Sequence, residues 1–170
     1  MSGRWDTGLG NLGHTAVYAR RMNDPSDLAL TDIRELVARH GWAIRHVLPD
    51  TASAQAPFSY TVGLTSRGWS ELIITGLPTA LADVFIRNAV DVQVQNGAFR
   101  AGDRSDELTE SGDVMFIPAE DVSGMTATTE IVGAFSALQL VWPDSAGHFP
   151  WHPRYRNSNA SQPLLGTAAG

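Results

Sequence analysis

The chain has 170 residues, of which 43% are hydrophobic and 18% charged, and its formal net charge is -6 at pH 7. This length and composition predict one globular domain and exclude a chain that is disordered throughout. The acidic balance argues against nucleic acid as a partner, because neutralising phosphates requires clustered basic side chains. Cysteine is absent and all twelve basic residues are arginines, which excludes disulfides, thiol nucleophiles, cysteine-ligated metals, lysine Schiff bases and P-loop lysines.

No pattern in the sequence predicts export or membrane insertion. The N-terminal stretch is rich in glycine and lacks the apolar run of about 7 or more residues that a signal peptide needs. No stretch approaches the roughly 18 to 20 apolar residues of a membrane span. We therefore expect a soluble cytoplasmic protein with a flexible N-terminal arm (1–23), a single domain (24–165) and a C-terminal tail (166–170).

Two segments have the periodicity of amphipathic helices. In the first, over residues 31–40, apolar side chains recur at helical spacing until Gly41 stops the pattern. The second follows Pro78, opens with Thr79 and ends at Gly97. Each helix should bury its apolar side against a sheet.

Several segments are predicted as strands from alternating or continuous apolar patterns. They lie within residues 42–48, 58–64, 72–74, 114–117 and 137–142. Residues 128–135 fit either a strand or a helix, and the segments 58–64 and 72–74 are most simply joined as a hairpin. The elements predict an α+β fold, with a mainly antiparallel sheet of four to six strands and two main helices on one face.

The densest group of aromatic and polar residues lies toward the C-terminus. It includes Trp142, Asp144, Trp151 and Tyr155, interleaved with prolines and histidines. Aromatic walls with a few polar groups are typical of a ligand pocket. The same composition also describes a segment that seals the core of a sheet, with Trp and Tyr exposing only their polar tips. The sequence leaves both interpretations open.

A metal site is not predicted in this region. Asp144, His148 and His152 are spaced by four, which on a helix would place three metal-ligating groups on one face. Pro150 forbids that helix, so the spacing loses its geometric meaning. His46 is the one further histidine that a strand would fix, and whether the three histidines converge stays open.

Serine hydrolase chemistry is not expected either. No G-x-S-x-G motif occurs, and neither Ser59 nor Ser70 follows the strand-to-turn pattern that exposes a nucleophile. Glu71 precedes an apolar strand, and Tyr60 and Thr61 lie in the middle of another. These three side chains would form the polar floor of a pocket across the predicted hairpin, or Glu71 would simply begin a strand at the surface.

Several motifs together carry a family resemblance. They are GW at 41–42, PFSYTVGL at 57–64, ELIITGL at 71–77, QLVWPD at 139–144, FPW at 149–151 and QPLL at 162–165. In this combination the chain, over about Leu36 to Leu165, resembles the bacterial domain-of-unknown-function family DUF4262. The resemblance supplies no function. It implies that one spatial neighbourhood contains Tyr60, Thr61, Glu71, Gln139, Trp142, Asp144 and Trp151.

Two hypotheses for function follow. The first is a non-catalytic binding or regulatory domain, whose aromatic and acidic cleft holds a small molecule or a peptide. The predicted ligand-binding residues are Tyr60, Thr61, Glu71, Gln139, Trp142, Asp144, Trp151 and Tyr155. The alternative is a small enzyme with Glu71 or Asp144 as base and a histidine as partner. The sequence identifies no cofactor, and the apolar strand 72–74 makes a homodimer a further expectation.

Overall fold

A computed structural model describes residues 25–49, 52, 54–110 and 112–168. The arm predicted for residues 1–23 lies outside this part of the chain. The strands are β1 (Ala43–Val47), β2 (Phe58–Val62), β3 (Glu71–Thr75), β4 (Arg104–Ser105), β5 (Val114–Pro118) and β6 (Ala137–Val141). The helices are α2 (Pro25–His40), α3 (Thr79–Asn96) and α4 (Thr126–Val132), with short 3-10 turns η1 (Leu64–Arg67) and η2 (Asn159–Ser161).

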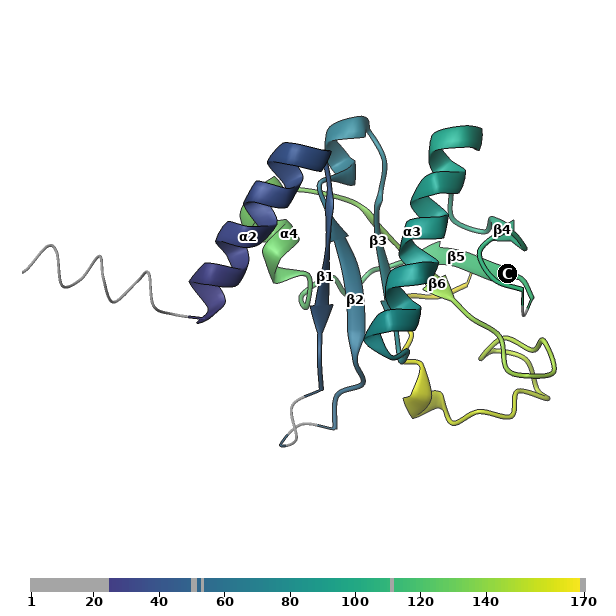
Figure 1. Ribbon diagram of the computed structural model, residues 1–170. Helices are drawn as coiled ribbons and strands as arrows, with labels where there is room; N and C mark the ends of the chain where they lie inside the picture. Colours follow the sequence, from purple (N-terminus) through teal and green to yellow (C-terminus); the bar gives the residue numbers. More distant parts are fainter. Residues whose placement is uncertain (1–24, 50–51, 53, 111, 169–170) are drawn as a thin grey trace, which may run out of the picture.

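The strands form one six-stranded sheet in the order β1-β2-β3-β6-β5-β4 (Figure 1). β3 and β6 are parallel, and every other neighbouring pair is antiparallel. The predicted α+β class and mainly antiparallel sheet are therefore confirmed. The predicted hairpin is also confirmed, because β2 pairs with β3 so that Tyr60 lies opposite Ile73. The segment that fitted a strand or a helix is helix α4.

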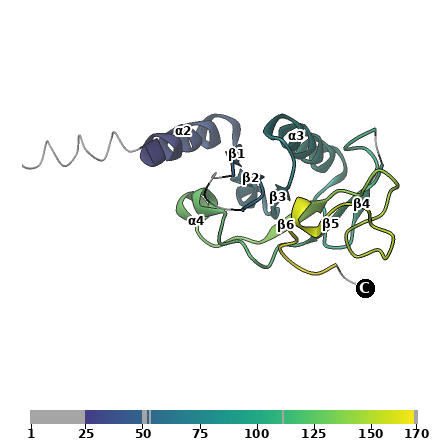
Figure 2. The same cartoon turned by 90° about the horizontal axis from the view of Figure 1, so that it is seen from below.

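Helices cover both faces of the sheet (Figure 2). Phe85 and Ile86 of α3 belong to a buried core with Leu72 and Ile74 of β3. On the other face, α4 packs over β2, and Ile33 of α2 shares that second core. The two longest helices, α2 and α3, therefore pack on opposite faces of the sheet, whereas the sequence predicted two main helices on one face. An apolar stripe determines which side of a helix is buried, but not which face of the sheet it meets.

The C-terminal segment (residues 159–168) is held by the buried side chain of Gln139 on β6. The Gln139 amide nitrogen donates to the hydroxyl of Thr75 at 3.1 Å and to the carbonyl of Pro163 at 2.8 Å. Its carbonyl oxygen accepts from the backbone nitrogen of Leu165 at 2.7 Å. Buried amides are stable only when such partners are present, so Gln139 joins the sheet to this segment.

Gln162 makes a second connection between the same segment and β6. Its side-chain amide donates to the carbonyl of Trp142 at 2.8 Å and accepts from the Trp142 backbone nitrogen at 2.9 Å. This reciprocal pair extends the hydrogen bonding of β6 beyond its last residue.

Among the helices of the described residues, none is long and apolar enough to cross a bilayer.

Gly76 is required where the C-terminal segment crosses the end of β3. Its φ is +83°, and a Cβ atom there would overlap the carbonyl oxygen of Ser161. We expect Gly76→Ala to lower the free energy of unfolding by about 4 kcal/mol or more, the range of the most damaging single substitutions. The measurement is urea unfolding followed by circular dichroism.

Gly97 provides the matched control for this prediction. Its φ is +96°, but nothing lies within 4 Å of the Cβ position. Gly97→Ala should therefore cost only the backbone strain of its positive φ, about 1 to 3 kcal/mol. Equal losses in the two variants would show that the close approach to Ser161 is unimportant.

Candidate functional site

The eight side chains predicted as a site are divided between the central strands and the loop that follows β6. Glu71 begins β3, opposite Ala137 of the parallel strand β6, whereas Trp142 follows the end of β6. Five residues of strand at about 3.3 Å each separate these two ends. Thr61 and Glu71 lie at one end, and Trp142 and Asp144 lie beyond the other.

The Glu71 carboxylate is buried and closes the connection between β2 and β3. It accepts hydrogen bonds from the hydroxyl of Thr61 at 2.6 Å and from the backbone nitrogen of Gly63 at 3.1 Å. Thr65 donates to it through its backbone nitrogen at 2.9 Å and through its hydroxyl at 2.7 Å. Four donors occupy the usual acceptor sites of a carboxylate. Glu71 therefore stabilises a loop and does not face a cavity.

Tyr60 and Thr61 fix the start of α4. The Tyr60 hydroxyl accepts from the backbone nitrogen of Ala127 at 3.1 Å, in the first turn of the helix. The hydroxyl of Thr128 donates to the carbonyl of Thr61 at 2.8 Å. Both Tyr60 and Thr61 are fully buried. Their polar groups therefore join strand to helix, and nothing of them is left at the surface to meet a ligand.

Asp144 organises the loop that follows β6. One carboxylate oxygen accepts from the backbone nitrogens of Ala146 and His148, both at 2.9 Å, and the other accepts from the backbone nitrogen of Arg156 at 2.8 Å. Burial of the carboxyl group raises the pKa of Asp144, but the donors and the nearby imidazole of His148 outweigh it. The net effect holds the pKa below its ordinary value. Asp144 is an ionised structural anchor.

The remaining predicted residues lie on or near the surface of this loop. Trp151 is 41% exposed and stacks on Phe149, with ring centroids 5.1 Å apart. The hydroxyl of Tyr155 is buried without a hydrogen-bond partner within the described residues. The rings of His148 and His152 stack at 4.2 Å.

The three histidines do not converge. His46 is on β1, which stands three strands from β6 in the sheet, a distance of about 14 Å at the usual strand spacing. His148 and His152 belong to the loop after β6. In the part of the chain that the structure describes, no group of three or more His, Asp or Glu side chains is placed to hold a metal ion.

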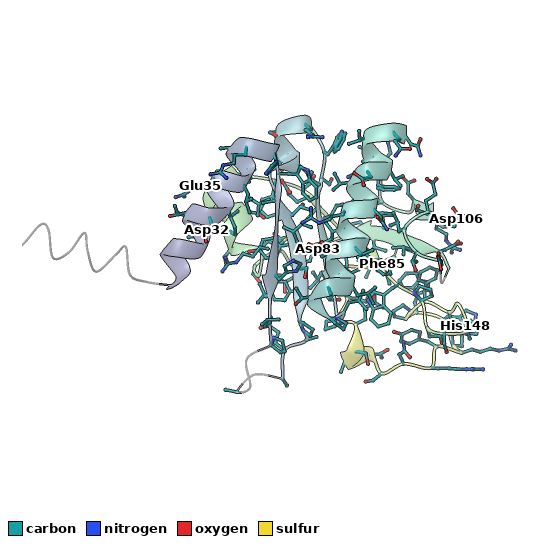
Figure 3. All side chains as sticks on the ribbon, viewed as in Figure 1. Asp32, Glu35, Asp83, Phe85, Asp106 and His148 are labelled. Carbon is teal, nitrogen blue, oxygen red and sulfur yellow. The ribbon has the colours of Figure 1, made fainter. Side chains whose placement is uncertain are left out.

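A largely apolar cleft lies between the start of α3 and the residues that follow β6. Its volume is about 400 Å³, and its lining residues are Leu77, Leu81, Phe85, Thr109, Gly112, Trp142, Pro143, Asp144 and Ser145. The indole nitrogen of Trp142 donates to the carbonyl of Thr75 at 3.0 Å, which fixes the plane of the ring. Phe85 contributes a second aromatic side chain from α3 (Figure 3).

Two of the predicted residues, Trp142 and Asp144, line this cleft. Sequence reasoning missed the contribution of Leu81 and Phe85 to it. Their apolar spacing predicted a buried helix face, yet Leu81 is 44% exposed because it lies at the rim of the cleft. In the sequence, an apolar residue that lines a cleft has the same spacing as one in the core. The two can be told apart only when the position of the neighbouring segment is known.

Comparison with known proteins identifies the family. A family model described as a domain of unknown function (DUF4262) matches residues 36–156. The match covers more than half of the chain, which therefore belongs to this family. No curated protein and no solved structure matches the chain.

The lowered pKa of Asp144 predicts a pH dependence of stability. Because the folded-state pKa lies below the unfolded value of about 3.9, ionised Asp144 stabilises the fold above that pH. This contribution is lost as the pH falls through the folded-state pKa. We expect Asp144→Asn to be less stable than the parent at pH 7, and the difference to shrink below about pH 3.9.

The measurement for Asp144→Asn is the free energy of unfolding in urea between pH 7 and pH 2.5. Asp106→Asn is the control, because Asp106 is an exposed carboxylate on another loop. It should change stability by less than about 0.5 kcal/mol. A difference between parent and Asp144→Asn that stays constant down to the lowest pH would contradict the role of the ionised carboxylate.

Proposed function

We propose that the protein is a small-molecule-binding domain and that its ligand occupies the apolar cleft beside Trp142. The observation that carries this proposal is the fixed indole ring of Trp142, which faces a cavity of about 400 Å³. A volume of this order is typical of small-molecule sites, which are lined mainly by apolar and aromatic side chains. A wall held by a hydrogen bond also needs little ordering when a ligand binds.

The chemistry of the lining favours a ligand with a neutral aromatic or aliphatic group. Leu77, Leu81 and Phe85 offer hydrocarbon surface, and Trp142 offers an aromatic face. Asp144 is the charged residue in the lining, but its carboxylate is occupied by three backbone donors. It is therefore poorly placed to recognise a cation, and apolar contact is the main source of affinity.

Binding in this cleft is proposed to be non-catalytic. The enzyme predicted as the alternative needs Glu71 or Asp144 as a free base. Four donors surround the carboxylate of Glu71, and three surround that of Asp144. This geometry supports binding over acid-base chemistry at these two residues.

Leu81→Glu tests the proposal. Leu81 is 44% exposed at the rim of the cleft, so the substitution places a charge in the cleft without removing a core side chain. The probe is N-phenyl-1-naphthylamine, a neutral aromatic dye whose fluorescence rises in apolar surroundings. We expect the parent to bind the dye and Leu81→Glu to bind it at least tenfold more weakly, because the dye would then have to desolvate a carboxylate.

Val94→Glu is the matched control for this experiment. Val94 is on the same helix, is 59% exposed and does not line the cleft. Its dye affinity should stay within twofold of the parent value, and circular dichroism should show both variants folded. The proposal fails if the parent does not bind the dye, or if the two glutamate variants lose affinity equally.

A further inference from the structure

A second, smaller pocket opens on the face of the sheet that α4 covers. Its volume is about 200 Å³, and Phe58, Ile73 and Thr75 line it from β2 and β3. Phe58 and Ile73 belong to the core that packs against α4, whereas Phe85 of the cleft beside Trp142 belongs to the core on the α3 side. Among the described residues, the pocket and that cleft have no lining side chain in common. They are therefore separate cavities on opposite faces of the sheet.

Asp121, in the loop before α4, gives this pocket a negative charge. Its side chain is exposed, and its Oδ1 atom accepts from the backbone nitrogen of Ser123 at 3.1 Å and from the Ser123 hydroxyl at 2.6 Å. These two hydrogen bonds hold the pKa of Asp121 below its ordinary value, so the carboxylate is ionised at neutral pH. Within the described residues, Oδ2 has no hydrogen-bond or ion-pair partner, and no residue that lines the pocket is basic. One oxygen of an ionised carboxylate is thus available to a ligand.

The hydroxyl of Thr75 adds an acceptor in the buried part of the pocket. Thr75 is 4% exposed and donates to the carbonyl of Pro163 at 2.8 Å. It also accepts from the side-chain nitrogen of Gln139 at 3.1 Å. A hydroxyl group has one donor and two acceptor sites, so these partners leave one acceptor site of Thr75 unused. Asp121 and Thr75 both favour a ligand that donates hydrogen bonds.

The remaining lining supplies aromatic and aliphatic surface. The ring of Phe58 is stacked on Tyr60 with the ring centroids 6.0 Å apart, which fixes its position in the wall of the pocket. Ile73 and Leu165 contribute hydrocarbon surface beside it. An aromatic ring attracts a cation by its negative face, and aliphatic side chains favour an apolar group. Hydrogen-bond acceptors, a negative charge and this surface together match an organic ammonium ion.

We propose that this pocket is a second binding site, and that it takes a small primary amine in its protonated form. The ammonium group would donate to Asp121, and the apolar group would lie against Phe58 and Ile73. A carboxylate or a phosphate is disfavoured because Asp121 would repel it. The volume is half that of the cleft beside Trp142, at about 200 against about 400 Å³, which favours a single ring or a short chain. The two sites therefore differ in the charge and the size of their ligands.

The test is a titration of the ¹⁵N-labelled full chain with benzylamine at pH 7 and low salt, followed by nuclear magnetic resonance. We expect saturable shifts that are largest at the backbone signals of Ser123 and Gly124, which line the pocket. Asp121→Asn should weaken binding about three- to fivefold, the range for a partly exposed ion pair. The variant should keep the loop, because an asparagine oxygen can accept both hydrogen bonds from Ser123.

Two controls separate the charge from the shape of the ligand and from the net charge of the protein. Benzyl alcohol has the shape of benzylamine without its charge, so it should bind the parent and Asp121→Asn equally. Asp106→Asn removes an exposed carboxylate from the loop between β4 and β5 and should bind benzylamine as the parent does. The proposal is overturned if the parent shows no saturable shifts at Ser123 and Gly124, if the largest shifts lie around Trp142, or if Asp121→Asn binds benzylamine as tightly as the parent.

Discussion

The parallel pairing of β3 with β6 determines which parts of the chain meet at the C-terminal ends of these two strands. In a parallel pair both strands end at the same edge of the sheet. Thr75 and Trp142 therefore meet there, and the indole of Trp142 bonds to the carbonyl of Thr75. The C-terminal segment returns across the same pair and is held by Gln139. Trp142, fixed by this bond, lines the cleft at the start of α3.

Buried polar side chains hold the loops and the C-terminal segment of this fold in place. Glu71 closes a loop, Gln139 holds the C-terminal segment, and Asp144 shapes the loop after β6. A buried donor left without its acceptor lowers the stability of the fold by about 1 to 3 kcal/mol. Each of these side chains therefore favours one arrangement of the chain around it. Carboxylates and amides are also the usual residues of binding sites. Because the same residue types serve both roles, the sequence predicted one acidic cleft where the structure has several buried polar side chains that each hold a loop or a segment.

Local patterns predict much of the fold, and long-range geometry accounts for the remainder. The alternation of residues 58–64, the continuous apolar run of 72–74 and the turn residues between them are enough to predict the hairpin of β2 and β3. Helical periodicity with a glycine stop predicts α3. The pairing of Glu71 with Ala137 joins residues far apart in the chain, and no local pattern encodes it. The approach of Asp83 to His46 depends on how α3 crosses the sheet. The meeting of His46 with Ser59 depends in turn on the register of β1 and β2, so the sequence presents these two only as separate residues.

A nuclear magnetic resonance titration can locate the ligand in the cleft beside Trp142. With the protein labelled with ¹⁵N, each tryptophan gives a separate indole signal, and N-phenyl-1-naphthylamine is added in steps. We expect the indole signal of Trp142 to shift most, together with the backbone signal of Leu81, while the indole signal of Trp151 stays in place. Largest shifts at Trp151 or around Glu71, with the Trp142 signal unchanged, would contradict it.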